Sequence, residues 1–307
     1  MKELMMLVGV TLGRRYTKKE KRYFGETIAK YFTELGYDIT IQTKQNAFST
    51  VNNMVIGNLD TAKKVIVAAY DTPGTISVPK YRYYPFNSKR NLRNESLSLA
   101  IRFLAASLLF VLIYFLLRNF MNYELWLKVV AVVLSVLLAW ISFFYLKGQG
   151  NPVNFNRNSA SIALICAVAR EYKGKDIAFV LLDQCVNSYE GLKALKEQMD
   201  GEGKEVLMLE SLAYGEELVL VMKGKTNAVS IVDNNDSLSI FEKSYEEIRA
   251  GNNFMQLFPN MLYLASGDNE NKQFVVNNSR SVRDCNIDMD RLETISKIVL
   301  SYMKGEQ

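Results

Sequence analysis

Two stretches of the chain are almost continuously apolar, Leu99–Leu117 and Leu125–Leu146. Each is long enough to cross a hydrocarbon core of about 30 Å as a helix. Each holds one charge near its start, Arg102 in the first and Lys128 in the second. Buried core helices of this length usually keep a polar stripe, which these stretches lack. Because only Arg118–Glu124 separates them, the pattern predicts a transmembrane hairpin of two helices.

Outside the hairpin, helical spacing alternates with strand spacing. Helices are expected over Lys18–Leu35, "SASIALICAVAREY", "SYEGLKALKEQM" and "DMDRLETISKIVLSYM". Strands are expected over "YDITIQT", "DIAFVLLD", "EVLMLE", "ELVLVMKG" and "NMLYLAS", with two more in "MVIGNLDTAKKVIVAAY". This alternation predicts an α/β sandwich with a mixed, largely parallel central sheet. With no internal repeat or linker, residues 1–97 and 148–307 are expected to form one domain, interrupted by the hairpin at 98–147.

The distribution of basic residues predicts the orientation of the hairpin. A hairpin returns the chain to its starting side, so the segments on either side of it share a compartment. Lysine and arginine are in excess on the cytoplasmic flank of membrane spans. The basic residues that flank the hairpin are Lys80, Arg82, Lys89, Arg90, Arg93 and Lys147. The turn holds only Arg118, with Lys128 just inside the second span. We therefore expect a cell-membrane protein with its soluble domain and both termini in the cytoplasm.

The cysteine content agrees with a reducing compartment. Cys166, Cys185 and Cys285 are an odd and sparse set, which is not a disulfide framework. The apolar stretch Leu4–Leu12 could be mistaken for a signal peptide. It lacks a small-residue cleavage site and Glu3 interrupts its basic start, so none is expected.

The basic segment Lys80–Arg93 lies beside the first predicted span in a chain of net charge +5. This position favours the anionic headgroups of the lipid bilayer, and not nucleic acid, as its partner. The alternative is a solvated loop that only sets the topology. The aromatic cluster Tyr81–Phe86 lies within this segment and is expected either at the membrane interface or in local packing.

Three acidic residues follow predicted strands. Asp71, Asp183 and Glu210 each come at the end of a buried apolar run. Ligands of parallel sheets bind beyond the carboxyl ends of the strands. These three side chains are therefore expected to mark the site.

Five segments, in order, resemble the co-catalytic zinc aminopeptidases, whose fold glutaminyl cyclases, the transferrin receptor and nicastrin share. The segments are "GRRYTKKEKRYFGETIAKYFTELGYDITIQ", "NMVIGNLDTAKKVIVAAYDTPG", "RNSASIALICAVA", "IAFVLLDQCVNSYEGLKAL" and "NNSRSVRDCNIDMDRLETISKIVLSYM". They cover nearly all of the soluble chain. The resemblance implies a three-layer zinc-aminopeptidase-like sandwich.

The family holds two zinc ions, and the resemblance shows where its ligands would stand here. The family's His-x-Asp after one strand corresponds to Ala69–Asp71, so the aspartate remains and the histidine is replaced by alanine. The bridging aspartate, which precedes a small-residue helix, corresponds to Arg157, with the following Asn158 retained.

The remaining ligand positions are also changed. The family's Glu-Glu pair corresponds to Cys185 and Val186, or to Gln184 and Cys185 if the register shifts by one. The later aspartate corresponds to Glu210, and the final histidine corresponds to Asn278. Of these, only Glu210 could still bind metal as the family's ligand does.

We expect no zinc, no other cofactor and no catalytic residue at this degenerate site. Zinc prefers nitrogen and sulfur ligands, usually three or four of them, and the chain contains no histidine. The guanidinium of Arg157 is always protonated, and like charges in one small cavity disfavour each other. We predict that Arg157 replaces the zinc by pairing with at least one of Asp71, Asp183 and Glu210.

Other chemistries have weaker support. A Cys185 nucleophile needs a basic partner, most often histidine; a redox or modification role for its thiol stays open. No spacing indicates a Ser–Lys dyad. The three acids Asp71, Asp183 and Glu210 could hold a hard cation such as Mg²⁺. Arg157 would satisfy the same carboxylates instead.

These observations favour a pseudoenzyme that acts as a binding, scaffold or regulatory subunit of a membrane complex, with another membrane protein as partner. Nicastrin, which lost its metals and became an assembly subunit, provides a fold-level analogy. One alternative is an active hydrolase with a rebuilt site around Asp71, Asp183, Cys185 and Glu210. Another is an accessory subunit of a transport complex, whose hairpin packs through small residues. Those residues are Ala105, Ala106, Ser107, Ala131 and Ser135.

Overall fold

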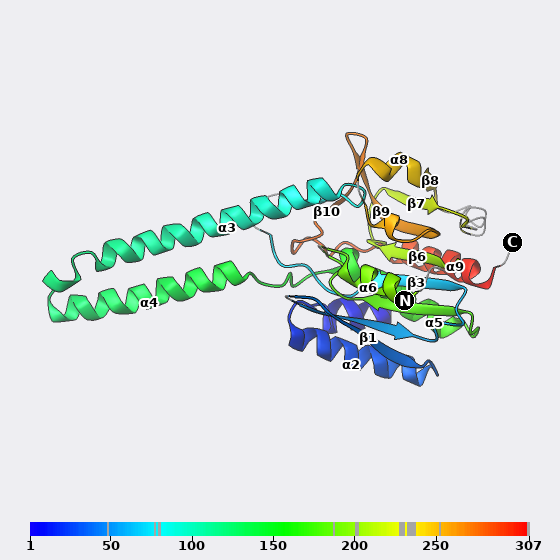
Figure 1. The fold of residues 1–307 in the computed structure, drawn as a ribbon, viewed down its shortest axis with the longest axis horizontal. Coiled ribbons are helices and arrows are strands. Elements are labelled where there is room, and N and C mark those ends of the chain that lie inside the picture. Colours follow the sequence, from blue (N-terminus) through cyan, green and yellow to red (C-terminus); the bar gives the residue numbers. More distant parts are fainter. Residues whose placement is uncertain are drawn as a thin grey trace.

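The computed structural model describes residues 1–47, 49–76, 78, 81–186, 188–199, 203–226, 231, 238–251 and 253–305. It contains an α/β domain with helices on both faces of a central sheet, and a long helical hairpin that projects from one end of it (Figure 1). The predicted three-layer sandwich with a mixed, largely parallel sheet is confirmed.

The strands of the described sheet come from both sides of the hairpin in the sequence. They are β1 Ile39–Gln45, β2 Thr50–Ile56, β3 Lys64–Ala69, β4 Arg82–Tyr83, β5 Ile177–Leu182, β6 Glu205–Glu210, β7 Glu217–Lys223, β8 Ile240–Ser244, β9 Met261–Glu270 and β10 Gln273–Asn277. Their order is β1-β2-β5-β3-β6-β9-β10-β4, and β7 joins β9 to β8. The central strands β5, β3, β6 and β9 are parallel, so their carboxyl ends meet at one edge.

Helices cover both faces of this sheet. One face carries α1 Lys2–Met5, the wider helical turn Met6–Thr11, α2 Lys18–Glu34, α5 Ala160–Glu171 and α9 Met289–Lys304. The other face carries α6 Glu190–Gln198, α8 Tyr245–Ile248 and the short turns Arg249–Gly251 and Phe254–Leu257. Another short helical segment, Phe155–Ser159, leads into α5.

The apolar pattern explains the two cores. Alternate side chains of a strand point to opposite faces, so Ile66 packs in one core and Val65 and Val67 pack in the other. All residues from Ala160 to Ala169 in α5 are buried, because its small side chains let the helix lie close to the sheet. The apolar segment Leu4–Leu12 also contributes to this core, through Leu4, Met5, Val8 and Leu12.

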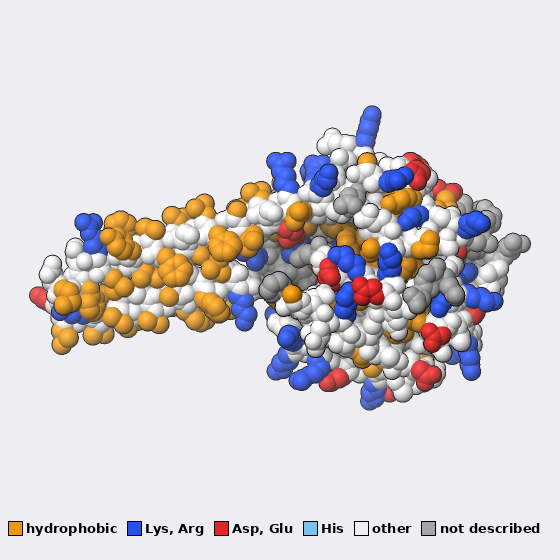
Figure 2. Space-filling model, viewed as in Figure 1, with side chains coloured by type: hydrophobic (Ala, Val, Ile, Leu, Met, Phe, Trp, Pro, Cys, Tyr) orange, Lys and Arg blue, Asp and Glu red, His pale blue; other side chains and the backbone are white. Residues whose placement is uncertain are grey.

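The hairpin consists of α3 Ser88–Leu117 and α4 Leu125–Lys147, joined through a short turn at Phe120–Asn122. Both helices are long and apolar enough to cross a membrane, and hydrophobic side chains cover their visible surface (Figure 2). Helix α3 begins well before the predicted start of its span because the side chain of Asn87 caps it, accepting the Arg90 N–H at 3.1 Å. The basic segment is therefore partly helical and not a loop. Lys80, which belongs to that segment, lies outside the described residues.

Contacts at its base fix the hairpin to the domain. The guanidinium of Arg102 donates to the Thr75 carbonyl, and Arg280 forms an ion pair with Glu95 on α3. Within the hairpin, Ala106 and Ala131 are buried between α3 and α4. These two small residues pack within the hairpin itself and are not available to a partner helix.

The aromatic cluster Tyr81–Phe86 packs inside the domain. Tyr81, Tyr83 and Tyr84 are all buried. The hydroxyl of Tyr81 donates to Glu95 at 3.1 Å, and Phe86 stacks on Phe274 with ring centroids 5.5 Å apart. Local packing, and not a membrane interface, accounts for this cluster.

Candidate functional site

Three buried carboxylates lie at the carboxyl edge of the parallel strands. Asp71 follows β3, Asp183 follows β5 and Glu210 ends β6, and their exposed fractions are 7%, 2% and 2%. This edge faces the hairpin, since Gly74 pairs with Gly150, which follows α4. The sequence analysis predicted correctly that all three acids lie at the ends of strands. Each acid has its own hydrogen-bond or ion-pair partners.

Glu210 forms a buried ion pair with Arg157. The guanidinium Nη1 of Arg157 contacts Glu210 Oε1, and both side chains are 2% exposed. The other carboxylate oxygen accepts the hydroxyls of Tyr263 at 2.6 Å and Tyr83 at 3.2 Å. The ring of Tyr83 also stacks under the guanidinium, whose carbon lies 3.9 Å from the ring centroid. The predicted pairing of Arg157 with one of the three acids is confirmed.

This environment keeps Arg157 charged. Burial alone would lower the pKa of Arg157, but the Glu210 carboxylate and the oxygens of Tyr83 and Tyr189 raise it well above its ordinary value. Its second terminal nitrogen, Nη2, is buried without a partner among the described residues. The pair is therefore a permanent cation and its counterion, enclosed by aromatic rings.

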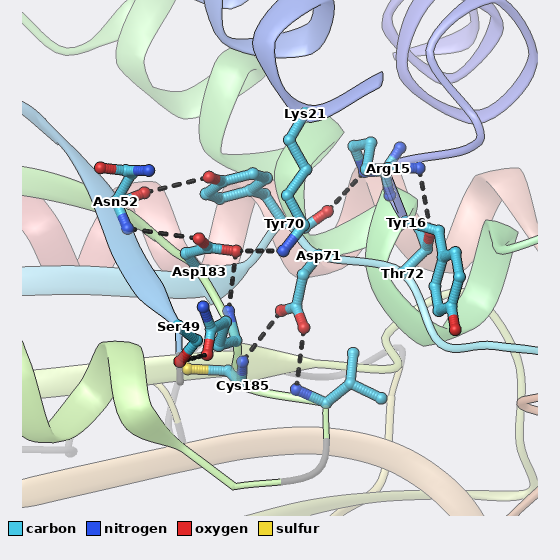
Figure 3. A network of polar contacts seen from close by, with 12 residues as sticks. Arg15, Tyr16, Lys21, Ser49, Asn52, Tyr70, Asp71, Thr72, Asp183 and Cys185 are labelled. Atoms are coloured by element: carbon cyan, nitrogen blue, oxygen red, sulfur yellow. Dashed lines mark hydrogen bonds and ion pairs between the residues drawn. The ribbon is translucent and has the colours of Figure 1, made fainter. Parts of the chain in front are cut away.

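Asp183 is paired with a different cation, Lys21 of α2 (Figure 3). Lys21 Nζ lies 2.5 Å from Asp183 Oδ1. The backbone N–H groups of Gln184, at 2.9 Å, and Asn52, at 3.2 Å, complete its hydrogen bonds. The hydroxyl of Tyr70, next to this pair in Figure 3, donates to the Asn52 carbonyl at 3.0 Å.

Asp71 accepts hydrogen bonds only from the backbone among the contacts described. Its two oxygens accept the N–H groups of Cys185 at 3.0 Å and Val186 at 3.3 Å. Burial raises the pKa of Asp71, and the nearby Asp183 adds to this, while Lys21 and the two N–H groups oppose it. Cys185 and Val186 thus bind this carboxylate through their backbone N–H groups.

The retained asparagine ties the helix to the strand end. Asn158 Nδ2 donates to the carbonyls of Ala69 at 3.2 Å and Asp71 at 2.8 Å. Its own oxygen is buried without a partner among the described residues. Ala69 itself is buried and presents only a methyl group.

A second buried arginine, Arg15, contacts the end of β3 close to Asp71 (Figure 3). Its guanidinium donates to the carbonyls of Tyr70 at 2.6 Å and Leu12 at 2.6 Å, and to Ser159 Oγ at 3.1 Å. Burial lowers the pKa of Arg15 to about 9, and Asp71 opposes this shift. Arg15 thus binds backbone carbonyls and the Ser159 hydroxyl, and within the described part of the chain it forms no ion pair.

Asn278 and Asp284 line a small pocket together with Asn156. Asn278 adopts a left-handed conformation (φ 61°) and its carbonyl accepts the Ser281 N–H at 3.0 Å. Asp284 accepts the backbone N–H of Arg157 at 3.2 Å. Burial raises the pKa of Asp284 to about 8, although the Arg157 N–H and its charge oppose the shift.

These residues do not fit a di-zinc centre. Arg157 and Lys21 place cationic groups directly on Glu210 and Asp183. Within the described ranges, no group of three or more His, Cys, Asp or Glu is arranged to hold a metal ion. A Mg²⁺ site is disfavoured for the same reason, because two of the three acids already contact a cation.

Cys185 does not have the environment of a nucleophile. It is fully buried. Burial, together with the neighbouring Asp71, raises the pKa of its thiol well above the ordinary value. The thiolate is the reactive form of cysteine, so a neutral buried thiol is unsuited to covalent catalysis or redox signalling.

Sequence reasoning missed four residues of the site: Lys21, Tyr83, Tyr263 and Arg15. None of them stands at a ligand position of the family. Lys21 and Arg15 lie in the basic segment "RRYTKKEKR", and Tyr83 lies in the aromatic cluster. The sequence therefore shows that these segments are basic and aromatic. Nothing in the linear sequence indicates which of these side chains turns inward.

Comparisons with known proteins show the fold of this chain. The Legionella pneumophila LapA aminopeptidase superimposes with a TM-score of 0.53 at 9% identity, over 98% of this chain and 67% of that one. A glutaminyl cyclase from an Acidobacteriales bacterium gives a TM-score of 0.52 at 11% identity, over 98% and 90%. No protein-family profile matches the sequence, and no curated protein sequence does so either. The domain thus has a zinc-aminopeptidase-like fold.

Proposed function

We propose that this chain is a non-catalytic member of the zinc-aminopeptidase-like fold, anchored in the cell membrane, which acts as a binding or regulatory subunit of a membrane complex. One observation carries the proposal: the Arg157 guanidinium contacts the carboxylate that the fold's zinc ligand would provide. Both carboxylate oxygens of Glu210 are already engaged, one by Arg157 and the other by the hydroxyls of Tyr263 and Tyr83. In this proposal, Arg157 takes the place of a metal ion.

The membrane placement rests on α3 and α4. Their apolar surfaces would face the acyl chains, and the basic residues Lys89, Arg90 and Arg93 at the start of α3 would lie on the cytoplasmic side. The soluble domain would then also be cytoplasmic.

The connection between hairpin and site supports a role in binding and signalling between membrane and domain. The loop after Asp71 pairs with the chain that leaves α4, through Gly74 and Gly150. Arg280 Nε donates to the Gly74 carbonyl at 3.0 Å and its terminal nitrogen pairs with Glu95 of α3. A partner that tilts the hairpin would therefore act directly on the strand ends that carry the site.

An active hydrolase with a rebuilt site has less support. Such an enzyme needs an activated nucleophile or a free general base. Cys185 is buried as a neutral thiol, Asp183 is held by Lys21 and Glu210 by Arg157. Asp71 has no cation in contact among the described residues, and two backbone N–H groups bind its oxygens.

A peptidase assay combined with mild-detergent purification tests the proposal. The chain purified in the presence of zinc is expected to hydrolyse aminoacyl-nitroanilide substrates no faster than its Glu210→Gln variant. It is also expected to elute with a membrane protein in fixed proportion, whose identity would show whether the complex is a transport complex. Hydrolysis that the wild-type chain performs and Glu210→Gln loses would refute the non-catalytic proposal. A chain that elutes alone from its native membrane would refute the subunit role.

A further inference from the structure

A groove of about 970 Å³ opens between α2 and the antiparallel strands β1 and β2. One wall is a single face of α2, and the floor is the face of β1 and β2 that points toward this helix. The volume lies at the upper end of the range of about 300–1,000 Å³ that is typical of ligand pockets. Most of the residues that line this groove are not part of the site described above.

The two ends of the groove differ in polarity. Near the start of α2, it is lined by the cations Lys18, Lys21 and Arg22 and by polar groups of β1 and β2 such as Gln45 and Thr50. Toward the end of α2, its lining is mainly apolar. The apolar lining residues are Phe24, Gly25, Ala29, Ile39, Ile41 and Met54. Ile41 is 51% exposed, which is unusual for isoleucine on the inner face of a sheet.

The polar end lies beside the membrane hairpin. Tyr16 lines the groove and packs against Gly150, where an added Cβ would lie 2.6 Å from the Tyr16 Cβ. Gly148, which caps α4, approaches the same tyrosine. In Figure 1, α2 and β1 point one of their ends toward the base of the hairpin. The cationic end of the groove therefore faces the surface at which α4 would leave the bilayer.

The charges of the groove favour an anion at this end. Its lining holds three cations, Lys18, Lys21 and Arg22, and two carboxylates, Glu26 and Asp183. Lys21 is paired with Asp183 at 2.5 Å, and Arg22 lies 3.8 Å from Glu26. Among the described lining residues, none forms an ion pair with Lys18.

We propose that this groove binds a single-chain anionic amphiphile, a fatty acid, taken from the adjoining membrane leaflet. Its carboxylate would lie at the polar end, near Lys18 and the hydroxyl of Tyr16. Its alkyl chain would lie along the floor and cover Ile41 and Ile39, removing apolar surface from water. This inference rests on the proposed membrane placement of the hairpin, but it does not depend on the absence of catalysis.

Photolabelling of the full-length chain tests the proposal. The chain is placed in phosphatidylcholine nanodiscs, exposed to palmitic acid that carries a diazirine on its alkyl chain, irradiated and digested for peptide mapping. We expect label on the β1–β2 segment around Ile41 and Met54, and competition by unlabelled palmitate. Methyl palmitate, which lacks the negative charge, should compete poorly. Label within α3 and α4 serves as the internal reference for lipid exposure.

Two pairs of variants distinguish binding in the groove from nonspecific effects on labelling. Lys18→Glu reverses the charge at the polar end and should weaken palmitate competition about tenfold, whereas Lys19→Glu, on an exposed neighbour outside the groove, should not. Ile41→Glu should abolish groove labelling, while Phe241→Glu, at a similarly exposed apolar position on β8, should leave it unchanged.

Three results would overturn the proposal: label confined to α3 and α4, equal competition by palmitate and its methyl ester, or displacement by an apolar peptide but not by palmitate. The last would indicate a peptide groove. Label in the groove without label in α3 and α4 would refute the membrane placement, and with it the membrane leaflet as the source of the fatty acid. Detection of peptidase activity would leave the groove result unaffected, so the two proposals fail separately.

Discussion

The Arg157 guanidinium and the Glu210 carboxylate are in direct contact, and both side chains are 2% exposed. The sequence resemblance to zinc aminopeptidases aligns these two positions with metal ligands of that family. In this chain the Arg157 guanidinium supplies a cation next to the Glu210 carboxylate. Charge balance at the strand ends is thus maintained within the protein.

The first prediction concerns stability. Arg157→Ala should reduce the free energy of unfolding by about 3–5 kcal/mol, because it leaves Glu210 charged and buried without a counterion. Thermal or urea unfolding in mild detergent measures the change. Arg93→Ala, which removes an exposed arginine from the first turns of α3, should change the stability far less.

A double replacement tests whether charge balance is the cause. Arg157→Met combined with Glu210→Leu removes both charges and should recover a large part of the lost stability, since apolar replacement of a buried pair is often neutral. Recovery should be incomplete, because the hydroxyls of Tyr83 and Tyr263 lose their acceptor. A double variant that is less stable than Arg157→Ala would argue against a charge-balancing role.

The second prediction concerns pH. Burial raises the pKa of Asp284 to about 8, whereas an aspartate in an unfolded chain titrates near about 3.9. Between these values the native state binds more protons than the unfolded state, so the free energy of unfolding should fall as pH rises from about 4 to about 8. The raised pKa of Asp71 acts in the same direction.

Asp284→Asn provides the control for this dependence. Asparagine cannot release a proton in this range but can still accept the Arg157 N–H through its oxygen. Urea midpoints measured across the range should therefore fall less steeply in Asp284→Asn than in the wild-type chain. Identical slopes would show that Asp284 does not titrate as its burial indicates.

The third prediction concerns topology and uses a native residue. Cys285 is exposed on the soluble domain, while Cys166 and Cys185 are buried. If the domain is cytoplasmic, an impermeant maleimide should not label the wild-type chain in intact cells, and should label Cys285 after permeabilisation. In a Cys285→Ser background, Asn119→Cys in the turn between α3 and α4 should be labelled in intact cells. The reverse pattern would place the domain outside the cytoplasm.

Much of the fold could be predicted from local patterns in the sequence. The uninterrupted run of "DIAFVLLD" predicts a fully buried strand, and β5 is buried along its whole length. The small residues of "SASIALICAVAREY" predict close packing on the sheet, as α5 shows. The start of α3 was missed because its first turns carry Lys89, Arg90 and Arg93, and a hydropathy pattern begins only where the apolar run begins.

The site was predictable only in part. Strand ends located Asp71, Asp183 and Glu210. Charge complementarity predicted that Arg157 would pair with at least one of them, and the structure shows that this acid is Glu210. The Lys21–Asp183 pair joins residues far apart in the chain, and its formation depends on how α2 lies across the sheet. Helical spacing fixes which face of α2 is apolar, but it does not fix which of several lysines reaches a buried carboxylate.

The zinc content of the purified chain tests the central claim most directly. The chain should be purified in detergent after incubation with zinc, separated from free metal by gel filtration, and analysed by elemental mass spectrometry alongside Arg157→Asp, which restores an acid at the bridging position. Because Arg157 and Lys21 occupy two of the carboxylates and no histidine is present, we predict far less than one zinc ion per wild-type chain. One or two tightly held zinc ions per wild-type chain, lost in Glu210→Gln, would contradict the account.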